Sequence, residues 1–378
     1  MSYVSNIITF TPGTLPKSKA THGGTNLTER QNLGLDNAIN DFSASISPLN
    51  ISEEVFNVIK DINLSEYPDP ECLSLKNSIA SSIQKHENIT INNNQIAIGN
   101  GSTELIYAIA AAFLLKPNTT YSSKSLIFYP TYGEYSTACN LYGSEISFIT
   151  PDHNKTGFIW DFQKAQHFIE SNQPDLIFLC NPNNPTGTYF NNQEITALIN
   201  SSEKSNTIIV IDEAYLDFSN TDERYTELIK TSNVLLLRSL TKSYGITGLR
   251  LGYCLGNSNL VSQIQHHIPP WSVNSLAQSA GIYLLDKNDK ILPAIQSVDI
   301  AKQYLTSALA EIGYEIETSD ANFLLIKVEN ALNTKMKLLK HNIMVRDCSS
   351  FGLPHHIRVG IKSLEDCEQL VAAIKNTN

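Results

Sequence analysis

Short apolar runs rich in β-branched residues alternate with helix-like stretches through the middle of the chain. The clearest runs occupy residues 95–98, 125–129, 176–180, 207–211 and 234–239. They are almost continuously apolar, which is typical of parallel strands covered on both faces. The stretches between them, such as 104–115 and 192–202, fit crossover helices. The pattern predicts an α/β core, with a mostly parallel sheet flanked by helices.

The pattern changes beyond Pro269 and Pro270. An amphipathic region covers 275–312, strand-like segments follow at 314–317, 323–328 and 357–359, and a last helix covers 363–374. This order is typical of a small α+β domain joined to the core by a long helix. The first fifty residues are polar and interrupted by Gly and Pro, as in an arm. We therefore predict an N-terminal arm over 1–50, a large domain over 51–268, and an interdomain helix with a small domain over 269–378.

Composition narrows the class of protein. The 378 residues are 42% hydrophobic and 17% charged, as in soluble globular proteins. The net charge of −10 argues against nucleic-acid or membrane partners, which need an extended basic surface. The longest apolar stretch, near 105–115, is too short to span a bilayer, and the first residues lack the pattern of a signal peptide. Six scattered cysteines without a C-x-x-C pair predict reduced thiols in a cytoplasmic protein and no zinc site.

Polar groups follow four of the predicted strands. Ligands of an open parallel sheet bind at this edge, outside the carboxyl ends of the strands. The Gly-rich turn 99–104 leads into a helix, and it could present N–H groups to a phosphate or form an ordinary cap. Asn184 lies in a loop of two Asn-Pro steps that could hold its amide in place, or form only a turn.

The last two strands are followed by charged groups. Asp212 directly after strand 207–211 needs a cation or donors if it is buried. Lys242 after strand 234–239 is a candidate for a lowered pKa and for Schiff-base chemistry, and Arg250 could form a fork to a phosphate. Alone, Asp212 would be read as a solvated acid and Lys242 as a surface lysine. Together the four strand ends match the phosphate, O3′, ring nitrogen and aldehyde of pyridoxal 5′-phosphate.

Three longer strings carry a family resemblance. NPNNPTG at 181–187, VIDEAY at 210–215 and SLTKSYGITGLRLGY at 239–253 resemble the fold type I pyridoxal-phosphate enzymes of the class II aminotransferase group. The resemblance extends over nearly the whole chain. It implies that Lys242 bonds the cofactor, that Asp212 pairs with the pyridine nitrogen, and that Asn184 and Tyr215 contact O3′. The residues implied to hold the cofactor phosphate are Ser102, Thr103, Ser239 and Arg250.

Three further residues are implied by the same resemblance. Tyr132 would stack on the cofactor ring. Tyr67, in the string YPDP at 67–70, resembles the tyrosine that reaches the partner's cofactor phosphate, which implies a homodimer. Arg358, in HIRVG at 356–360, matches the arginine that binds the substrate α-carboxylate.

Two members of the group compete. Histidinol-phosphate aminotransferases share most of these strings, including YPDP. HGG at 22–24, DFSA at 41–44 and RDCS at 346–349 instead resemble threonine-phosphate decarboxylases, which implies that His22 and Arg346 contact the substrate. His22 could equally be a tail residue and Arg346 a surface ion-pair residue. Which arginine takes the phosphate and which the carboxylate stays open at this point.

The favoured activity is pyridoxal-phosphate-dependent decarboxylation of an O-phospho-amino acid. The product would be the amino-alcohol phosphate of the cobamide nucleotide loop. Ser45 and Ser47 stand where the decarboxylases have Asn, at positions that the resemblance implies border the substrate site, so O-phospho-L-threonine and O-phospho-L-serine both remain candidate substrates. The alternative is histidinol-phosphate aminotransfer or a related transamination.

Overall fold

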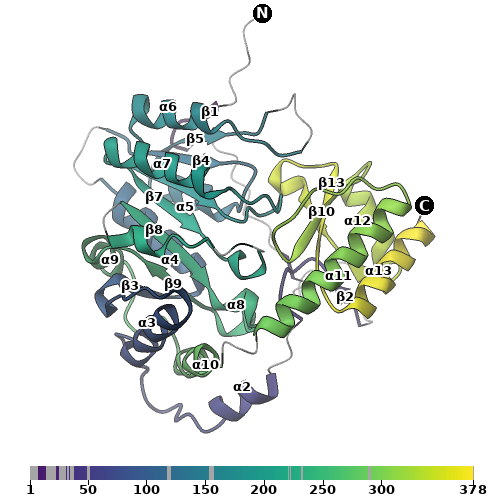
Figure 1. Ribbon diagram of the computed structural model, residues 1–378, viewed down its shortest axis with the longest axis horizontal. Helices are drawn as coiled ribbons and strands as arrows, with labels where there is room; N and C mark the ends of the chain where they lie inside the picture. The colour runs from purple at the N-terminus through teal and green to yellow at the C-terminus, as the bar shows by residue number, and fades with distance from the viewer. Residues whose placement is uncertain are drawn as a thin grey trace, which may run out of the picture.

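The computed structural model describes residues 7–13, 23–24, 31, 34, 38–48, 52–116, 121–152, 157–219, 221, 223–230, 233–287 and 291–377. The main sheet lies at the centre of the larger part of the molecule (Figure 1). Its strands, in spatial order, are β1 (Ile7–Phe10), β5 (Glu145–Ile149), β4 (Lys124–Phe128), β6 (Leu176–Cys180), β7 (Ile208–Asp212), β8 (Val234–Ser239), β9 (Leu251–Leu255) and β3 (Ile96–Asn100). β5, β4, β6, β7 and β8 are parallel neighbours. β1 pairs antiparallel with β5, and β9 pairs antiparallel with both β8 and β3. The predicted α/β fold with a mostly parallel sheet is therefore confirmed.

Helices cover both faces of this sheet, as its apolar strands require. One face packs against α3 (Leu73–Glu87), α6 (Phe162–Asn172), α7 (Asn192–Lys204) and α10 (Ser275–Asp286). The other face packs against α4 (Gly101–Leu114), α5 (Glu134–Leu141) and α9 (Ser258–Gln265). The short helices α2 (Ser52–Ile59), which contacts α10, and α8 (Leu240–Ser243), which follows β8, complete this part.

A smaller part with its own apolar core lies beside the main sheet (Figure 1). Its three-stranded sheet consists of β10 (Phe323–Lys327), β13 (His356–Gly360) and β12 (Arg346–Asp347). Its helices are α11 (Ile291–Glu311), α12 (Ala331–Leu339) and α13 (Leu364–Thr377). The predicted domain limits at residues 50 and 268 stay a prediction.

The N-terminal region joins the smaller part through main-chain contacts. β2 (Asn40–Asp41) pairs in parallel with β11 (Ile343–Met344). Immediately after β2, Phe42 is fully buried in the core of the smaller part. Gly360 N donates a hydrogen bond of 2.8 Å to Phe42 O. These contacts fix the start of segment 43–47, which leads toward the pocket described below.

Some sequence expectations differ in detail from the structure. The amphipathic region 275–312 forms two helices, α10 and α11. Segment 314–317 forms no strand and makes a single bridge from Ile316 to Ile326. α4 begins at Gly101 rather than at Glu104, so Ser102 and Thr103 lie inside its first turn. Strand β7 includes Asp212 as its last residue instead of ending one residue earlier.

Candidate active site

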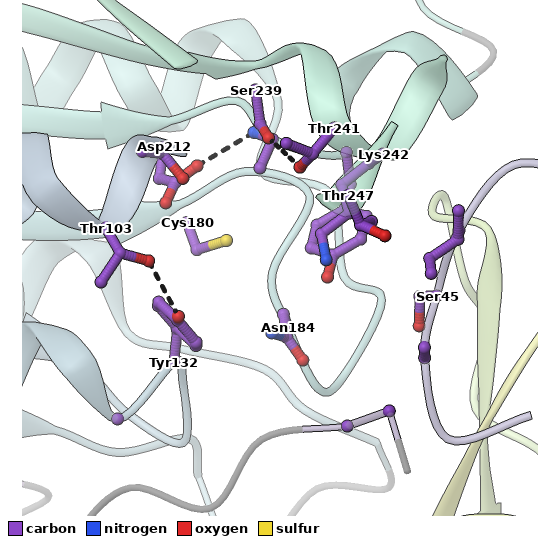
Figure 2. A pocket seen from close by; sticks show the side chains of 18 of the residues that line it. Ser45, Thr103, Tyr132, Cys180, Asn184, Asp212, Ser239, Thr241, Lys242 and Thr247 are labelled. Carbon is purple, nitrogen blue, oxygen red and sulfur yellow. Dashed lines mark hydrogen bonds between the residues drawn. The ribbon is translucent and has the colours of Figure 1, made fainter. Parts of the chain in front are cut away.

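A cavity of about 620 Å³ opens where four strands of the main sheet end (Figure 2). The last residues of β3, β6, β7 and β8 all line it: Asn100, Cys180, Asp212 and Ser239. The sequence-predicted residues that line the same cavity are Ser102, Thr103, Tyr132, Asn184, Asp212, Tyr215, Ser239, Lys242, Arg250, Arg346 and Arg358. The structure thus brings together side chains that are up to 256 positions apart, from Ser102 to Arg358.

Asp212 is held in place by donors rather than by a cation. Its Oδ2 accepts a hydrogen bond of 2.6 Å from Tyr135 Oη, and its Oδ1 accepts one of 3.0 Å from the backbone N–H of Ala214. Among the described residues, Asp212 forms no ion pair. Burial therefore raises the pKa of Asp212, although both hydrogen bonds and the charge of Lys242 act in the opposite direction. A protonated heterocyclic nitrogen would supply the missing cation.

Lys242 lies in the second half of the short helix α8, and its side chain faces the cavity. Burial and the positive charges of Arg358 and Arg250 lower the pKa of Lys242 to about 8, while Asp212 acts in the opposite direction. The lowered pKa increases the fraction of neutral amine near pH 7, which is the form that attacks a carbonyl carbon.

The first turn of α4 and Arg250 form a cradle for an anion. A Cβ added to Gly101, whose φ is +78°, would lie 2.5 Å from Arg250 Nη2. The guanidinium of Arg250 is thus packed directly against the helix N-terminus, where backbone N–H groups and the helix dipole favour a phosphate. Ser239 Oγ and Thr241 Oγ1 lie 2.7 Å apart and add hydroxyl groups to the pocket lining.

Tyr132 and Asn184 are positioned by one buried asparagine. Asn183 Nδ2 donates to Pro130 O at 2.9 Å, and Thr131 Oγ1 donates to Asn183 Oδ1 at the same distance. These bonds connect the loop after β6 to the loop after β4. Tyr132 Oη also lies 3.2 Å from Thr103 Oγ1, on the cradle side of the cavity (Figure 2).

Arg358 enters the cavity from β13 of the smaller part. Its Nη1 donates to Asn184 Oδ1, its Nη2 donates to Ser43 O at 3.0 Å, and its guanidinium lies 5.0 Å from the ring centre of Phe323. Its Nε is buried and has no hydrogen-bond partner among the described residues. Arg358 therefore retains a donor for an anionic group in the cavity.

Arg346 reaches the same cavity from β12. Its Nη2 donates a hydrogen bond of 2.7 Å to Ser350 Oγ, and its guanidinium lies over the ring of Phe351. Since Ser350 accepts from Arg346, the hydroxyl proton of Ser350 is available to a ligand. Arg346 is buried, which contradicts the reading of it as a surface ion-pair residue.

Two other predicted residues are Tyr67 and His22. Tyr67 does not line the cavity. It is 80% exposed and its ring centre lies 4.8 Å from that of Trp271. His22 lies outside the described residues, but the next two residues, Gly23 and Gly24, line the cavity. A Cβ on Gly23 would lie 2.1 Å from Ser43 O, so a larger residue cannot take its place without a backbone shift.

The residues present fit pyridoxal phosphate, the cofactor expected from the sequence. Asp212 is a buried carboxylate that forms no ion pair with the described residues, which suits a protonated pyridine nitrogen. Lys242 carries an amine with a lowered pKa, which suits a bond to the aldehyde. The cradle at Gly101 and Arg250 suits the phosphate. Among the residues that the structure describes, no group of three or more His, Cys, Asp or Glu could hold a metal ion.

Tyr135 was not predicted as a site residue, whereas the resemblance implied that Ser45 borders the substrate site. Tyr135 is fully buried, stacks on Phe178 and donates to Asp212. No sequence signal relates it to Asp212, because α5 begins at Glu134 and Tyr132 lies in the loop before it. Ser45 comes from a segment that carries no periodic pattern.

A buried ion-pair network lies next to the strand ends that carry Asp212 and Ser239. Arg238 Nε donates to Glu213 Oε2 at 2.7 Å, and Arg238 Nη1 donates to Glu87 Oε1 at 2.6 Å. Thr226 Oγ1 accepts from Arg238 Nη2 at 2.8 Å. Neither Arg238 nor Glu213 lines the cavity, so we expect this network to stabilise the fold at this edge of the sheet.

Arg238→Met should lower the free energy of unfolding by about 3–5 kcal/mol, because two largely buried carboxylates would lose their cation. Urea denaturation followed by circular dichroism measures this loss. The control is Lys230→Met, which removes an exposed ion pair with Glu227 and should cost less than about 1 kcal/mol. Equal losses in both variants would contradict a stabilising role for the network.

Comparison with known proteins shows which protein family this chain matches. The family model "Aminotransferase class I and II" matches residues 35–374. A protein of Caldanaerobacter subterraneus subsp. tengcongensis named "Putative threonine-phosphate decarboxylase" is 33% identical over 340 residues, which are 88% of each chain. The histidinol-phosphate aminotransferase of the same organism is 31% identical over 88% of this chain and 91% of its own.

A third relative is larger than this chain. The "Adenosylcobalamin biosynthesis bifunctional protein CobDQ" of Leptospira interrogans is 32% identical over 94% of this chain, which matches 41% of that protein. Among solved structures, the L-threonine-O-3-phosphate decarboxylase of Porphyromonas gingivalis superposes with a TM-score of 0.74 at 26% identity, over 89% of this chain and 98% of its own. The histidinol-phosphate aminotransferase of Clostridium acetobutylicum has a TM-score of 0.78 at 27% identity, over the same shares.

Proposed function

Because the chain belongs to the aminotransferase class I and II family and its cofactor is pyridoxal 5′-phosphate, we propose that it decarboxylates an O-phospho-L-amino acid. The substrates that we propose are O-phospho-L-threonine and O-phospho-L-serine, and the product is the corresponding amino-alcohol phosphate. The relatives named above support a place in assembly of the cobamide nucleotide loop.

One observation carries the choice of substrate: the cavity holds two arginines beyond those needed for the cofactor. With Arg250 at the phosphate cradle, Arg346 and Arg358 remain for the substrate. An O-phospho-amino acid has two anionic groups, a phosphate and a carboxylate, which match these two arginines. The Nε of Arg358, which has no partner in the described part of the chain, and the available proton of Ser350 support one anion beside each arginine.

We assign the substrate carboxylate to Arg358 and the phosphate to Arg346. Arg358 is hydrogen-bonded to Asn184, on the loop after β6, so it faces the part of the cavity shared with the cofactor. The reacting carbon bears the carboxylate and must lie near Lys242, which lines the same cavity. His22 is proposed as a further contact to the phosphate.

When bound, the cofactor supplies an electron sink for the pair released at the substrate Cα. Asp212 would pair with the pyridine nitrogen, and Tyr135 and the N–H of Ala214 hold Asp212 in position. Arg358 orients the bond between Cα and the carboxylate, which breaks to release CO₂. Lys242 Nζ then delivers a proton to Cα, so that hydrogen replaces the carboxylate.

The exposed pair Tyr67 and Trp271 supports a homodimer. Phe56, Leu64 and Leu73 are other apolar side chains of the same region of the chain that are more than half exposed. Since Tyr67 does not line the cavity of its own chain, we propose that it contacts the cofactor phosphate of a second copy.

The described helices include none that is long and apolar enough to cross a membrane.

A substrate panel tests the proposed function. Cofactor-loaded protein is incubated with O-phospho-L-threonine, O-phospho-L-serine or histidinol phosphate, each with and without 2-oxoglutarate. We expect consumption of a phospho-amino acid that does not depend on 2-oxoglutarate, because decarboxylation needs no amino acceptor. Consumption of histidinol phosphate that requires 2-oxoglutarate and forms glutamate would favour the aminotransferase instead.

The two arginines should give opposite binding defects. Arg358→Gln should weaken the binding of L-threonine, which has only the carboxylate, by about 30-fold or more, and leave O-phosphoethanolamine nearly unaffected. Arg346→Gln should weaken the binding of O-phosphoethanolamine by a similar factor and leave L-threonine nearly unaffected. Both losses are expected because removal of one partner of a buried charge pair costs at least about 2 kcal/mol. Titration calorimetry measures both ligands. The opposite pattern would exchange the two assignments.

A further inference from the structure

Tyr129 connects the main sheet to the turn that separates β12 from β13. It follows β4 directly, and its Oη donates a hydrogen bond of 2.6 Å to the main-chain oxygen of Phe351. Burial raises the pKa of Tyr129, so its hydroxyl keeps the proton that it donates. A Cβ built on Gly352, whose φ is +75°, would lie 2.4 Å from Tyr129 Oη. The absence of a side chain at Gly352 therefore allows the hydroxyl to approach the turn this closely.

The backbone of Tyr129 is fixed to the main sheet. Its N–H donates to Ile149 O on β5 at 2.9 Å, and its carbonyl oxygen accepts from Trp160 Nε1 at 3.1 Å. Its ring lies edge-on to that of Phe148, with 5.2 Å between the two ring centres. Because both the main chain and the ring are held, the Tyr129 hydroxyl has a defined position relative to the strands of the main sheet.

The turn that accepts this hydrogen bond, η6 (Cys348–Phe351), carries the partners of Arg346. Arg346 Nη2 donates to Ser350 Oγ at 2.7 Å, and the guanidinium of Arg346 lies 5.3 Å from the ring centre of Phe351. Arg346, Ser350 and Phe351 all line the cavity, whereas Tyr129 does not. A displacement of the turn would therefore move both partners of Arg346 together, and Tyr129 acts on the cavity only through the turn.

We propose that Tyr129 is a positioning residue that holds Arg346 and Ser350 in place for the phosphate of the bound substrate. Arg358, which we assign to the carboxylate, depends on other contacts, because it lies on β13 and donates to Asn184. Loss of the Tyr129 hydroxyl should therefore weaken the binding of the phosphate and spare that of the carboxylate. The inference rests on the proposed function only in the assignment of a substrate phosphate to Arg346.

The test compares Tyr129→Phe with the unchanged protein, both loaded with cofactor. The substitution keeps the ring and removes only the hydroxyl. Titration calorimetry measures dissociation constants for O-phosphoethanolamine, which has a phosphate and no carboxylate, and for L-threonine, which has a carboxylate and no phosphate. We expect Tyr129→Phe to weaken O-phosphoethanolamine binding about fivefold, as for the loss of one hydrogen bond, and to change L-threonine binding less than about twofold.

A second tyrosine variant separates positioning from a general loss of stability. Tyr283→Phe is the matched control, because Tyr283 Oη donates to Glu54 Oε2 at 2.7 Å and neither residue lines the cavity. It should leave both affinities unchanged. Urea denaturation measures the free energy of unfolding of both variants. A purely structural role for Tyr129 would lower the free energy of unfolding of Tyr129→Phe and leave both of its affinities unchanged, as in Tyr283→Phe.

Three results would overturn the inference. They are an unchanged O-phosphoethanolamine affinity in Tyr129→Phe, an equal or larger loss for L-threonine, and an unchanged protein to which O-phosphoethanolamine does not bind. None depends on decarboxylation. If the protein released no CO₂ and Tyr129→Phe still lost affinity for O-phosphoethanolamine alone, the proposed decarboxylation would fail while the role of Tyr129 stood. If CO₂ were released and both affinities were unchanged, the reverse would hold.

Discussion

Lys242→Ala should abolish the visible absorption of the covalently attached cofactor and nearly all turnover. Lys242 carries a cavity-facing amine whose pKa is lowered to about 8, and we assign to it both the bond to the cofactor and the proton delivered to Cα. Loss of the proton transfer alone should slow turnover by about 10²–10⁴-fold. Absorption spectra with and without added pyridoxal phosphate, together with single-turnover rates, measure both effects.

The control for Lys242→Ala is a substitution that changes another lysine outside the cavity. Lys230→Ala removes an exposed side chain and should keep the spectrum and the rate. Circular dichroism establishes that both variants are folded. A Lys242→Ala variant that retained the absorption of a covalently bound cofactor would contradict the assignment of this lysine.

Asp212→Asn should retain cofactor but slow turnover by about 10²–10³-fold. Asn has nearly the shape of Asp, but its single oxygen can replace only one of the two carboxylate oxygens that accept from Tyr135 and Ala214, and it lacks the negative charge that would keep the pyridine nitrogen protonated. Loss of one electrostatic group aimed at developing charge typically has this magnitude. Cofactor content by absorbance and turnover by product formation measure the two effects separately.

The neighbouring residue supplies a matched control for Asp212→Asn. Glu213 is also buried and carboxylic, but its carboxylate binds Arg238 and does not line the cavity. Glu213→Gln should therefore lower the free energy of unfolding, with little effect on the turnover rate per folded molecule. A near-normal turnover rate in Asp212→Asn would remove the argument that this residue tunes the cofactor.

The part of the site at the sheet edge could be predicted because of one geometric rule. Parallel strands end at the same edge, so residues just past apolar runs converge. The runs 176–180 and 234–239 coincide with β6 and β8, which placed Asn184 and Lys242 correctly at that edge. Asp212 also lies there, although β7 extends one residue further than expected.

The remaining residues could not be placed from local pattern alone. Tyr135 reaches Asp212 from α5 on another part of the chain. The spacing of apolar residues in the sequence does not indicate whether Tyr132 or Tyr135 makes this contact. Ser45 is placed by main-chain contacts of an irregular segment with β13 and Lys242. Arg358 and Arg346 enter from a separate small sheet, so their approach depends on how the two parts pack.

The central claim is that the bond between Cα and the carboxylate is the one that breaks. The most direct measurement uses O-phospho-L-threonine labelled with ¹³C at the carboxyl carbon and follows labelled CO₂ and aminopropanol phosphate together. The account predicts one molecule of each per substrate consumed, without any 2-oxo acid. Consumption that leaves the label in a 2-oxo acid, with the amino group transferred and no labelled CO₂, would contradict it.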